Sequence, residues 1–185
     1  MEKERIYRVL GIKRKISFKD LVKESNTSKS YVSKIVNKLV KNNLVLKKDQ
    51  IEIIDLKEFI KFWGIEKRNI LKRTNYFLTD ILFLEDFLSE ISKKDYVISG
   101  QFVENLISKQ SPGNSLWVYV FDKEIYIELL KEFKKKGSGR IKVILYDYHI
   151  KYGSFLLQGY RIVALEQLAA DLIAEGIFTD ISFLS

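Results

Sequence analysis

Residues 27–45 read TSKSYVSKIVNKLVKNNLV, and their apolar positions recur with the period of an α-helix. Val32, Ile35, Val36, Leu39 and Val40 follow the spacing i, i+3, i+4, i+7, i+8, which places them on one stripe that can be buried. A serine at position 28 is a good N-cap, because its hydroxyl satisfies a free backbone N–H. The pattern therefore predicts a helix over 28–41, ended by the two asparagines that follow.

The opposite face of this predicted helix combines cations with short hydrogen-bonding side chains and contains no acid. Such a face suits the major groove of double-stranded DNA, because Lys meets phosphate or guanine while Ser and Asn reach base edges. Tyr31, near the start of the helix, either packs internally or touches a backbone phosphate. The DNA-binding residues expected on this helix are Ser28, Lys29, Ser30, Tyr31, Ser33, Lys34, Asn37 and Lys38.

The flanking segments predict two further helices and a hairpin. One helix runs from about residue 2 to 10, and a second follows Ser17, a good N-cap. Asn26 suits a left-handed turn between the second helix and the third. The segment LVLKKDQIEII (44–54) alternates around a polar tip, as two paired strands do. Lys47 and Lys48 near that tip are expected to reach phosphate in a neighbouring minor groove.

Residues 1–55, with their lengths and pattern taken together, resemble the winged helix-turn-helix domain of transcription regulators. The resemblance implies that the helix over 28–41 is a recognition helix and that the hairpin is the wing. The alternative interpretation is that the third helix is an ordinary amphipathic helix in a unit that packs only against protein.

Composition and charge limit the kinds of function and site that the chain can have. The chain has 185 residues and a net charge of +8. Residues 1–75 hold 20 Lys/Arg and 9 Asp/Glu, a difference of +11, whereas residues 76–185 hold 12 and 15, a difference of −3. This asymmetry favours a polyanion-binding first part. The chain has no cysteine and one histidine, His149, which exclude a disulfide framework and a thiolate or His-rich metal site.

No apolar run has the length of a membrane span, and the N-terminal segment MEKERIYRVLGIKRK is charged, unlike a signal peptide. We therefore expect a cytoplasmic protein without a membrane partner.

Residues 56–95 are expected to form a helical connector. Asp55 caps a helix that Gly64 ends, a basic segment covers 67–77, and another amphipathic helix covers about 80–92. The absence of a Gly/Ser-rich stretch predicts a rather rigid connection.

Residues 96–185 alternate between strand and helix patterns, which predicts an α/β domain. YVIS (96–99) reads as a strand, QFVENLISK (101–109) as a helix and SLWVYVF (115–121) as a strong strand. The turn Ser99-Gly100, followed by a helix and a strand, resembles the core of nucleotidyltransferases. That family implies metal-binding acids on the strand, where this chain has Trp117, Val118, Tyr119 and Val120.

The nearest acids of suitable spacing are Asp122 and Glu124, with Asp147 at the end of a later strand. They serve either as metal ligands or as ordinary helix-cap, helix-dipole and loop residues. The segment KKKGSGR (134–140) is similarly either a phosphate cradle or a solvated turn.

Three segments, YVISG, LWVYVF and RIVALEQLAADLIAEG, together resemble the AbiEi-type antitoxins of type IV toxin–antitoxin systems. Gln167, Leu168, Asp171 and Leu172 stand at the places that match. This resemblance implies a winged helix-turn-helix domain joined to a catalytically silent, nucleotidyltransferase-like domain. The expected fold class is therefore α+β, with domains at 1–55 and 96–185 and the connector between them.

The function expected from these features is sequence-specific, non-enzymatic DNA binding, in an antitoxin-like autorepressor that requires no cofactor or metal. The C-terminal domain would then bind a toxin protein or a second copy of the chain, through apolar faces at 80–92 and 161–176. The alternatives are an active metal-dependent nucleotidyltransferase using Asp122, Glu124 and Asp147, and a protein-interaction adaptor.

Overall fold

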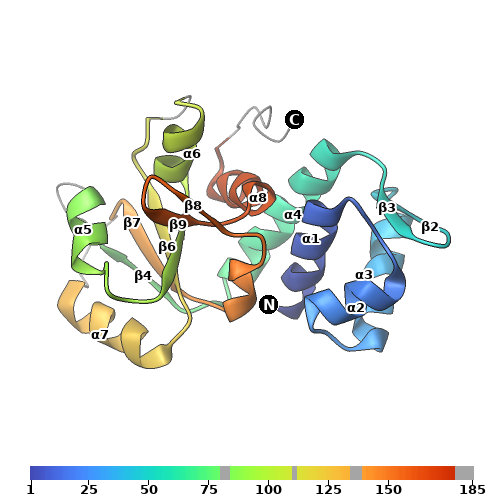
Figure 1. Cartoon of the computed structure of the whole chain (residues 1–185), viewed down its shortest axis with the longest axis horizontal. Helices are drawn as coiled ribbons and strands as arrows, with labels where there is room; N and C mark the ends of the chain where they lie inside the picture. The colour runs from blue at the N-terminus through green and yellow to red at the C-terminus, as the bar shows by residue number, and fades with distance from the viewer. Residues whose placement is uncertain (80–83, 110–111, 134–138, 178–185) are drawn as a thin grey trace. The chain divides into compact units, whose positions relative to one another are not determined.

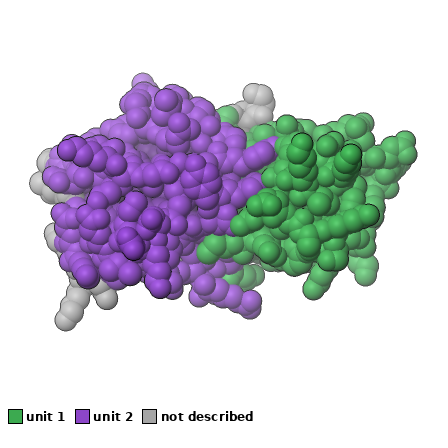
Figure 2. Space-filling view, turned by 60° about the horizontal axis from the view of Figure 1, so that its bottom comes forward, with its two compact units in different colours: residues 1–69, 165–185 green, residues 70–164 purple. Residues whose placement is uncertain are grey.

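The computed structural model describes residues 1–79, 84–109, 112–133 and 139–177, which form an α+β fold. The chain divides into two compact units, residues 1–69 with 165–185 and residues 70–164, which Figure 2 distinguishes by colour. The domain boundaries expected after residues 55 and 95 differ from this division. We call the two parts unit 1 and unit 2.

Unit 1 begins with three helices, α1 (Glu2–Lys13), α2 (Phe18–Ser25) and α3 (Lys29–Lys41), seen in blue in Figure 1. The predicted caps are confirmed, because the Ser17 hydroxyl accepts from the Asp20 N–H at 3.1 Å and the Ser28 hydroxyl from the Tyr31 N–H at 3.3 Å. Asn26 is left-handed with φ of 47°. The predicted apolar stripe of α3 is buried except for Val40, which lies at its margin and is 37% exposed.

A small antiparallel sheet completes this part of unit 1. Its strands β1 (Lys15–Ile16), β2 (Val45–Lys47) and β3 (Ile51–Ile53) lie in the order β1-β3-β2. The predicted hairpin is confirmed as β2 and β3. Strand β1 was not predicted, because two residues are too few to show an alternating pattern.

Helix α4 (Leu56–Leu71) continues through Gly64, so the prediction that this glycine ends the helix is wrong. The glycine instead permits close packing against helix α8 (Leu165–Glu175). A Cβ atom at position 64 would lie 2.5 Å from Ile173 Cγ2 and 3.0 Å from the carbonyl oxygen of Ala170. Helix α8 therefore packs against the N-terminal helices of unit 1, although it lies about 100 residues farther along the chain.

A cluster of charged side chains is buried where α1, α4 and α8 meet. Lys67 Nζ lies 2.7 Å from Glu4 Oε1 and 3.5 Å from Asp171 Oδ1. Gln167 donates to both carboxylates, at 2.9 and 2.7 Å, and accepts from Arg8 Nε at 2.9 Å. Each of these side chains is at most 1% exposed. The two cations and two anions balance, which is the condition under which buried charge is tolerated.

The cluster predicts a loss of stability in acid. Burial raises the pKa of Glu4, but the charges of Lys67 and Arg8 and the hydrogen bonds from Lys67 and Gln167 outweigh it, so the folded pKa lies below the ordinary 4.5. Glu4 therefore contributes stability above pH 4.5, and the contribution disappears as pH falls through the lower folded value. We expect the free energy of unfolding, measured in urea between pH 5 and pH 3, to fall less steeply in Glu4→Gln than in wild type. Equal slopes in the two proteins would contradict this assignment.

Unit 2 is built on a mixed sheet of six strands in the order β4-β7-β6-β5-β9-β8. The strands are β4 (Tyr76–Thr79), β5 (Tyr96–Ser99), β6 (Leu116–Val120), β7 (Ile141–Leu145), β8 (Phe155–Leu157) and β9 (Tyr160–Ile162). Strand β6 lies near the centre, and all five of its residues are buried. The expected strands at 96–99 and 115–121 are confirmed as β5 and β6. Strand β4 falls in the segment expected to belong to a helical connector, and β8 was not predicted.

The helices of unit 2 are α5 (Leu84–Glu90), α6 (Gln101–Ile107) and α7 (Lys123–Phe133), with a 3₁₀ turn, η1, at Tyr148–Lys151. In Figure 1, α5 and α7 lie close together beside the sheet. The Phe87 and Phe133 rings meet at 5.1 Å between centroids, and the Phe77 and Tyr126 rings at 5.6 Å. The apolar side of α5 is thus used inside unit 2. The predicted helix over 80–92 begins in residues outside the described ranges.

Candidate nucleic-acid interface

The predicted recognition face is the solvent-exposed side of α3. Ser30, Lys34 and Asn37 are exposed and Ser33 is half-buried, and their spacing by three and four residues puts them on one side of the helix. Lys41 continues this row in the last turn and is also exposed. It was missing from the expected site, although the same i+4 spacing from Asn37 identifies it. The face therefore contains three polar, uncharged side chains and two lysines, with no acid among them.

The structure brings one lysine of the hairpin next to this face. A depression in the surface of unit 1 is lined by Lys29, Ser30, Ser33, Lys47 and Phe18. These residues come from α3, β2 and the start of α2, which lie together in Figure 1. The Lys47 ammonium lies 5.6 Å from the centre of the Phe18 ring, which orients it by a cation–π contact. Phe18, which contacts Lys47 at this surface, was absent from the site residues expected from sequence.

Ser28 and Tyr31 have structural positions at the start of α3. The Ser28 hydroxyl accepts a hydrogen bond from the Tyr31 N–H, which caps the beginning of the helix. It also lies 3.3 Å from the Ser30 hydroxyl. Tyr31 is half-buried, and burial, followed by the nearby charge of Glu2, raises the pKa of its phenol. Glu2 belongs to α1, so Tyr31 lies at the margin of α3 that faces that helix.

Lys38 lies at the same margin of α3 as Tyr31. Its ammonium is 3.3 Å from Glu66 Oε2 and 5.3 Å from the centre of the Phe62 ring, both on α4. Lys34, one turn earlier, is likewise exposed but forms no ion pair with the described residues. The structure thus separates Lys38 from the other predicted contacts by giving it an intramolecular partner.

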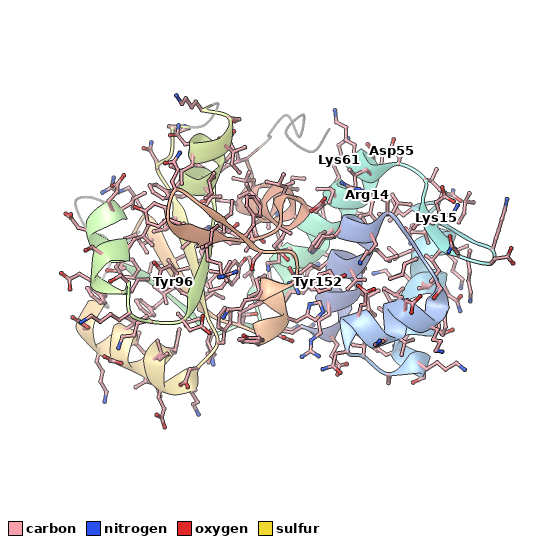
Figure 3. The ribbon with its side chains drawn as sticks, viewed as in Figure 1. Arg14, Lys15, Asp55, Lys61, Tyr96 and Tyr152 are labelled. Atoms are coloured by element: carbon pink, nitrogen blue, oxygen red, sulfur yellow. The ribbon has the colours of Figure 1, made fainter. Side chains whose placement is uncertain are left out.

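Lys48 belongs to a separate surface at the outer side of the hairpin, lined by Lys15, Leu46, Lys48, Asp49, Gln50 and Glu52. Lys15 and Glu52 form an exposed ion pair at 2.9 Å, and Figure 3 shows Lys15 next to the hairpin. Arg14, also labelled there, pairs with Glu166 at 2.8 Å. Lys48 is exposed near the hairpin tip, whereas Lys47 is the residue that joins the depression beside α3.

The net charges of the two compact units differ from those of the two parts of the linear sequence. Unit 1 holds 18 Lys/Arg and 13 Asp/Glu, a difference of +5, and unit 2 holds 14 and 11, a difference of +3. The acids of α8, Glu166, Asp171 and Glu175, belong to the same unit as the basic N-terminal helices. Two of them, Glu166 and Asp171, pair with Arg14 and Lys67. The net positive charge of unit 1 is therefore about half of the value for residues 1–75 in the linear sequence.

The acids of the nucleotidyltransferase alternative have local roles in the structure. Asp122 Oδ1 accepts from the Glu124 and Ile125 N–H groups at 2.6 and 3.3 Å, at the start of α7. Asp147 Oδ1 accepts from the His149 N–H at 2.8 Å and caps η1. Within the four described ranges, no three His, Asp or Glu side chains are placed to hold one metal ion. The phosphate-cradle segment 134–140 lies largely outside those ranges.

The two apolar faces expected to bind a partner are internal. Leu168, Ala169 and Leu172 of α8 are fully buried, as are Phe87 and nearly all of Leu88 on α5. Their hydrophobic periodicity thus reflects packing inside the chain.

Comparisons with protein-family models, curated proteins and solved structures found no match for this chain. None of the helices in the described part of the chain combines the length and apolarity needed to cross a membrane.

Proposed function

We propose that the protein is a sequence-specific, double-stranded DNA-binding transcription regulator. The observation that carries the proposal is the exposed, acid-free face of α3 with Ser30, Ser33 and Asn37 at its middle and lysines around it. Serine and asparagine side chains hydrogen-bond base edges, and lysines neutralise the flanking phosphates. An ordinary solvated helix has no need to exclude acids from its exposed face.

In this proposal, unit 1 acts as a winged helix-turn-helix domain. Helix α3 enters the major groove, and the β2–β3 hairpin is the wing. The shared depression supports this assignment, because it holds Lys47 on the same surface as Ser30 and Ser33. Lys48 at the tip then contacts the backbone farther along the duplex.

We further propose that the protein is an antitoxin-like autorepressor of the AbiEi type, located in the cytoplasm. Unit 2 is then a non-catalytic, nucleotidyltransferase-like domain that binds a toxin or a second copy of the chain. The support is the sequence resemblance, together with the capping roles of Asp122 and Asp147. Gln167 and Asp171, two residues that carry the resemblance, hold α8 in unit 1 through the buried cluster.

The decisive experiment changes the middle of the α3 face. The double variant Lys34→Ala with Asn37→Ala removes one cation and one base-reading amide from exposed positions. We expect its affinity for the DNA upstream of its own gene to fall by roughly 10- to 100-fold, with a shallower dependence on salt. Fluorescence anisotropy at several salt concentrations, with circular dichroism to verify folding, measures both effects.

The matched control is Lys93→Ala with Asn114→Ala, the same two changes at exposed positions of unit 2. It should bind as tightly as wild type. If the α3 double variant also binds as tightly as wild type, α3 is not the recognition helix. If wild type binds no duplex at low salt, the adaptor interpretation replaces DNA binding.

A further inference from the structure

Glu66 links the margin of the proposed recognition face to two other helices of unit 1. It lies on α4, and its Oε2 atom is 3.3 Å from the ammonium of Lys38 on α3. The same oxygen accepts from Lys3 on α1. Burial raises the pKa of Glu66, but the hydrogen bonds and charges of Lys3 and Lys38 outweigh this effect, so its pKa lies below the ordinary value. The carboxylate is therefore ionised at neutral pH.

Lys38 is placed where its ammonium can contact either Glu66 or a phosphate of bound DNA. It follows Lys34 by one helical turn, so it lies directly beside the proposed DNA face. Its side chain is 44% exposed, so its ammonium remains accessible to solvent. The Phe62 ring and Glu66 hold that ammonium on the α4 side.

We propose that Glu66 competes with DNA phosphate for Lys38 and so restrains the electrostatic part of DNA binding. This inference rests on the proposed function and adds a residue that regulates the same site. A lysine that neutralises a phosphate releases a condensed counterion and adds about 0.9 to the slope of log K against log salt. A lysine already paired with a carboxylate releases less, and the carboxylate itself repels the phosphate.

The test is Glu66→Gln, which keeps the size of the side chain and removes its charge. Binding is measured on a 30-base-pair duplex of random sequence and on the upstream DNA, at several salt concentrations. We expect Glu66→Gln to bind both duplexes roughly 3- to 10-fold more tightly at 0.1 M salt, with a slope steeper by about 0.9. In a Lys38→Ala background the same change should have little effect.

The matched control is Glu58→Gln on the same helix, whose carboxylate pairs with Lys61 at 2.6 Å and touches no lysine of α3 in the contacts described above. It removes the same charge and should leave the salt slope unchanged. If Glu58→Gln tightens binding as much as Glu66→Gln, or the effect persists without Lys38, the inference is overturned and net charge alone explains the result. If wild type binds and Glu66→Gln changes nothing, only this inference fails. If wild type binds neither duplex, the proposed function fails as well.

Discussion

Lys67→Met is expected to lower the free energy of unfolding by about 3–5 kcal/mol, because it leaves two buried carboxylates with only one buried cation. Lys67 is fully buried, with Glu4 at 2.7 Å and Asp171 at 3.5 Å. Methionine matches the length of the lysine stem but cannot donate hydrogen bonds or carry charge. The remaining cation, Arg8, cannot balance two carboxylates, so the cluster acquires a net negative charge at a buried site.

The two tryptophans allow this loss to be measured in unit 1 alone. Trp63 belongs to unit 1 and Trp117 to unit 2, and the chain has no others. Urea unfolding followed by fluorescence in a Trp117→Phe background therefore reports on unit 1. Lys61→Met is the matched control, because Lys61 is on the same helix, is 38% exposed and pairs with Glu58 in solvent. Exposed pairs of this kind contribute little, so the control should lose at most about 0.5 kcal/mol.

A double variant separates the charge from the packing. Adding Glu4→Gln to Lys67→Met removes one of the two carboxylates. The double variant should therefore lose less unfolding free energy than the sum of the losses in the two single variants. Should Lys67→Met cost no more than Lys61→Met, the buried cluster does not stabilise unit 1.

Gly64→Ala is expected to cost about 2–3 kcal/mol, even though alanine is normally the better helix former. The added Cβ would meet Ile173 Cγ2 at 2.5 Å and Ile173 Cβ at 2.6 Å. Because the Cβ atom of Ile173 is fixed to the helix backbone, a side-chain rotation cannot remove this clash, and the backbone oxygen of Ala170 would also lie close, at 3.0 Å. Helices α4 and α8 must then move apart, which also disturbs the charged cluster between them.

The same substitution at Gly11, inside α1, is the control. A Cβ there has its nearest contact at 3.3 Å, with the Trp63 ring, and the next at 3.5 Å, with Glu166 Cβ. Small shifts accommodate these contacts, so Gly11→Ala should change stability by less than about 1 kcal/mol. Urea unfolding of both variants with the Trp63 probe decides the matter. Equal losses would show that α4 and α8 do not depend on a glycine contact.

Local features of the fold could be predicted where the physical cause spans only a few residues. The α3 stripe, its acid-free face and the caps Ser17 and Ser28 all depend on spacings of three or four positions. The strands of unit 2 with strong apolar runs, β5 and β6, were equally predictable. Very short strands such as β1 and β8 were not, because two or three residues cannot establish a period.

The residues of the candidate site that follow from local helical spacing could also be predicted. Ser30, Ser33, Lys34 and Asn37 were identified from helical spacing and are accessible on one face. Phe18 was missed because its relation to Lys47 crosses 29 positions of the chain. Lys38 has the same spacing as its neighbours, and only the position of Glu66 on another helix distinguishes it.

The local sequence alone determines that residues 28–41 form a helix with one apolar side and one acid-free polar side. The reason is that both sides are set by residues three or four positions apart, which lie on adjacent turns of the same helix. The tertiary structure decides which elements belong together. Glu4 and Gln167 meet although 163 positions separate them, and this contact places α8 with the N-terminal helices. Such pairings depend on shape and on charge balance in a buried space, and no local spacing encodes either. For the same reason, Gly64 looked like a helix end in sequence and is a packing contact in the folded protein.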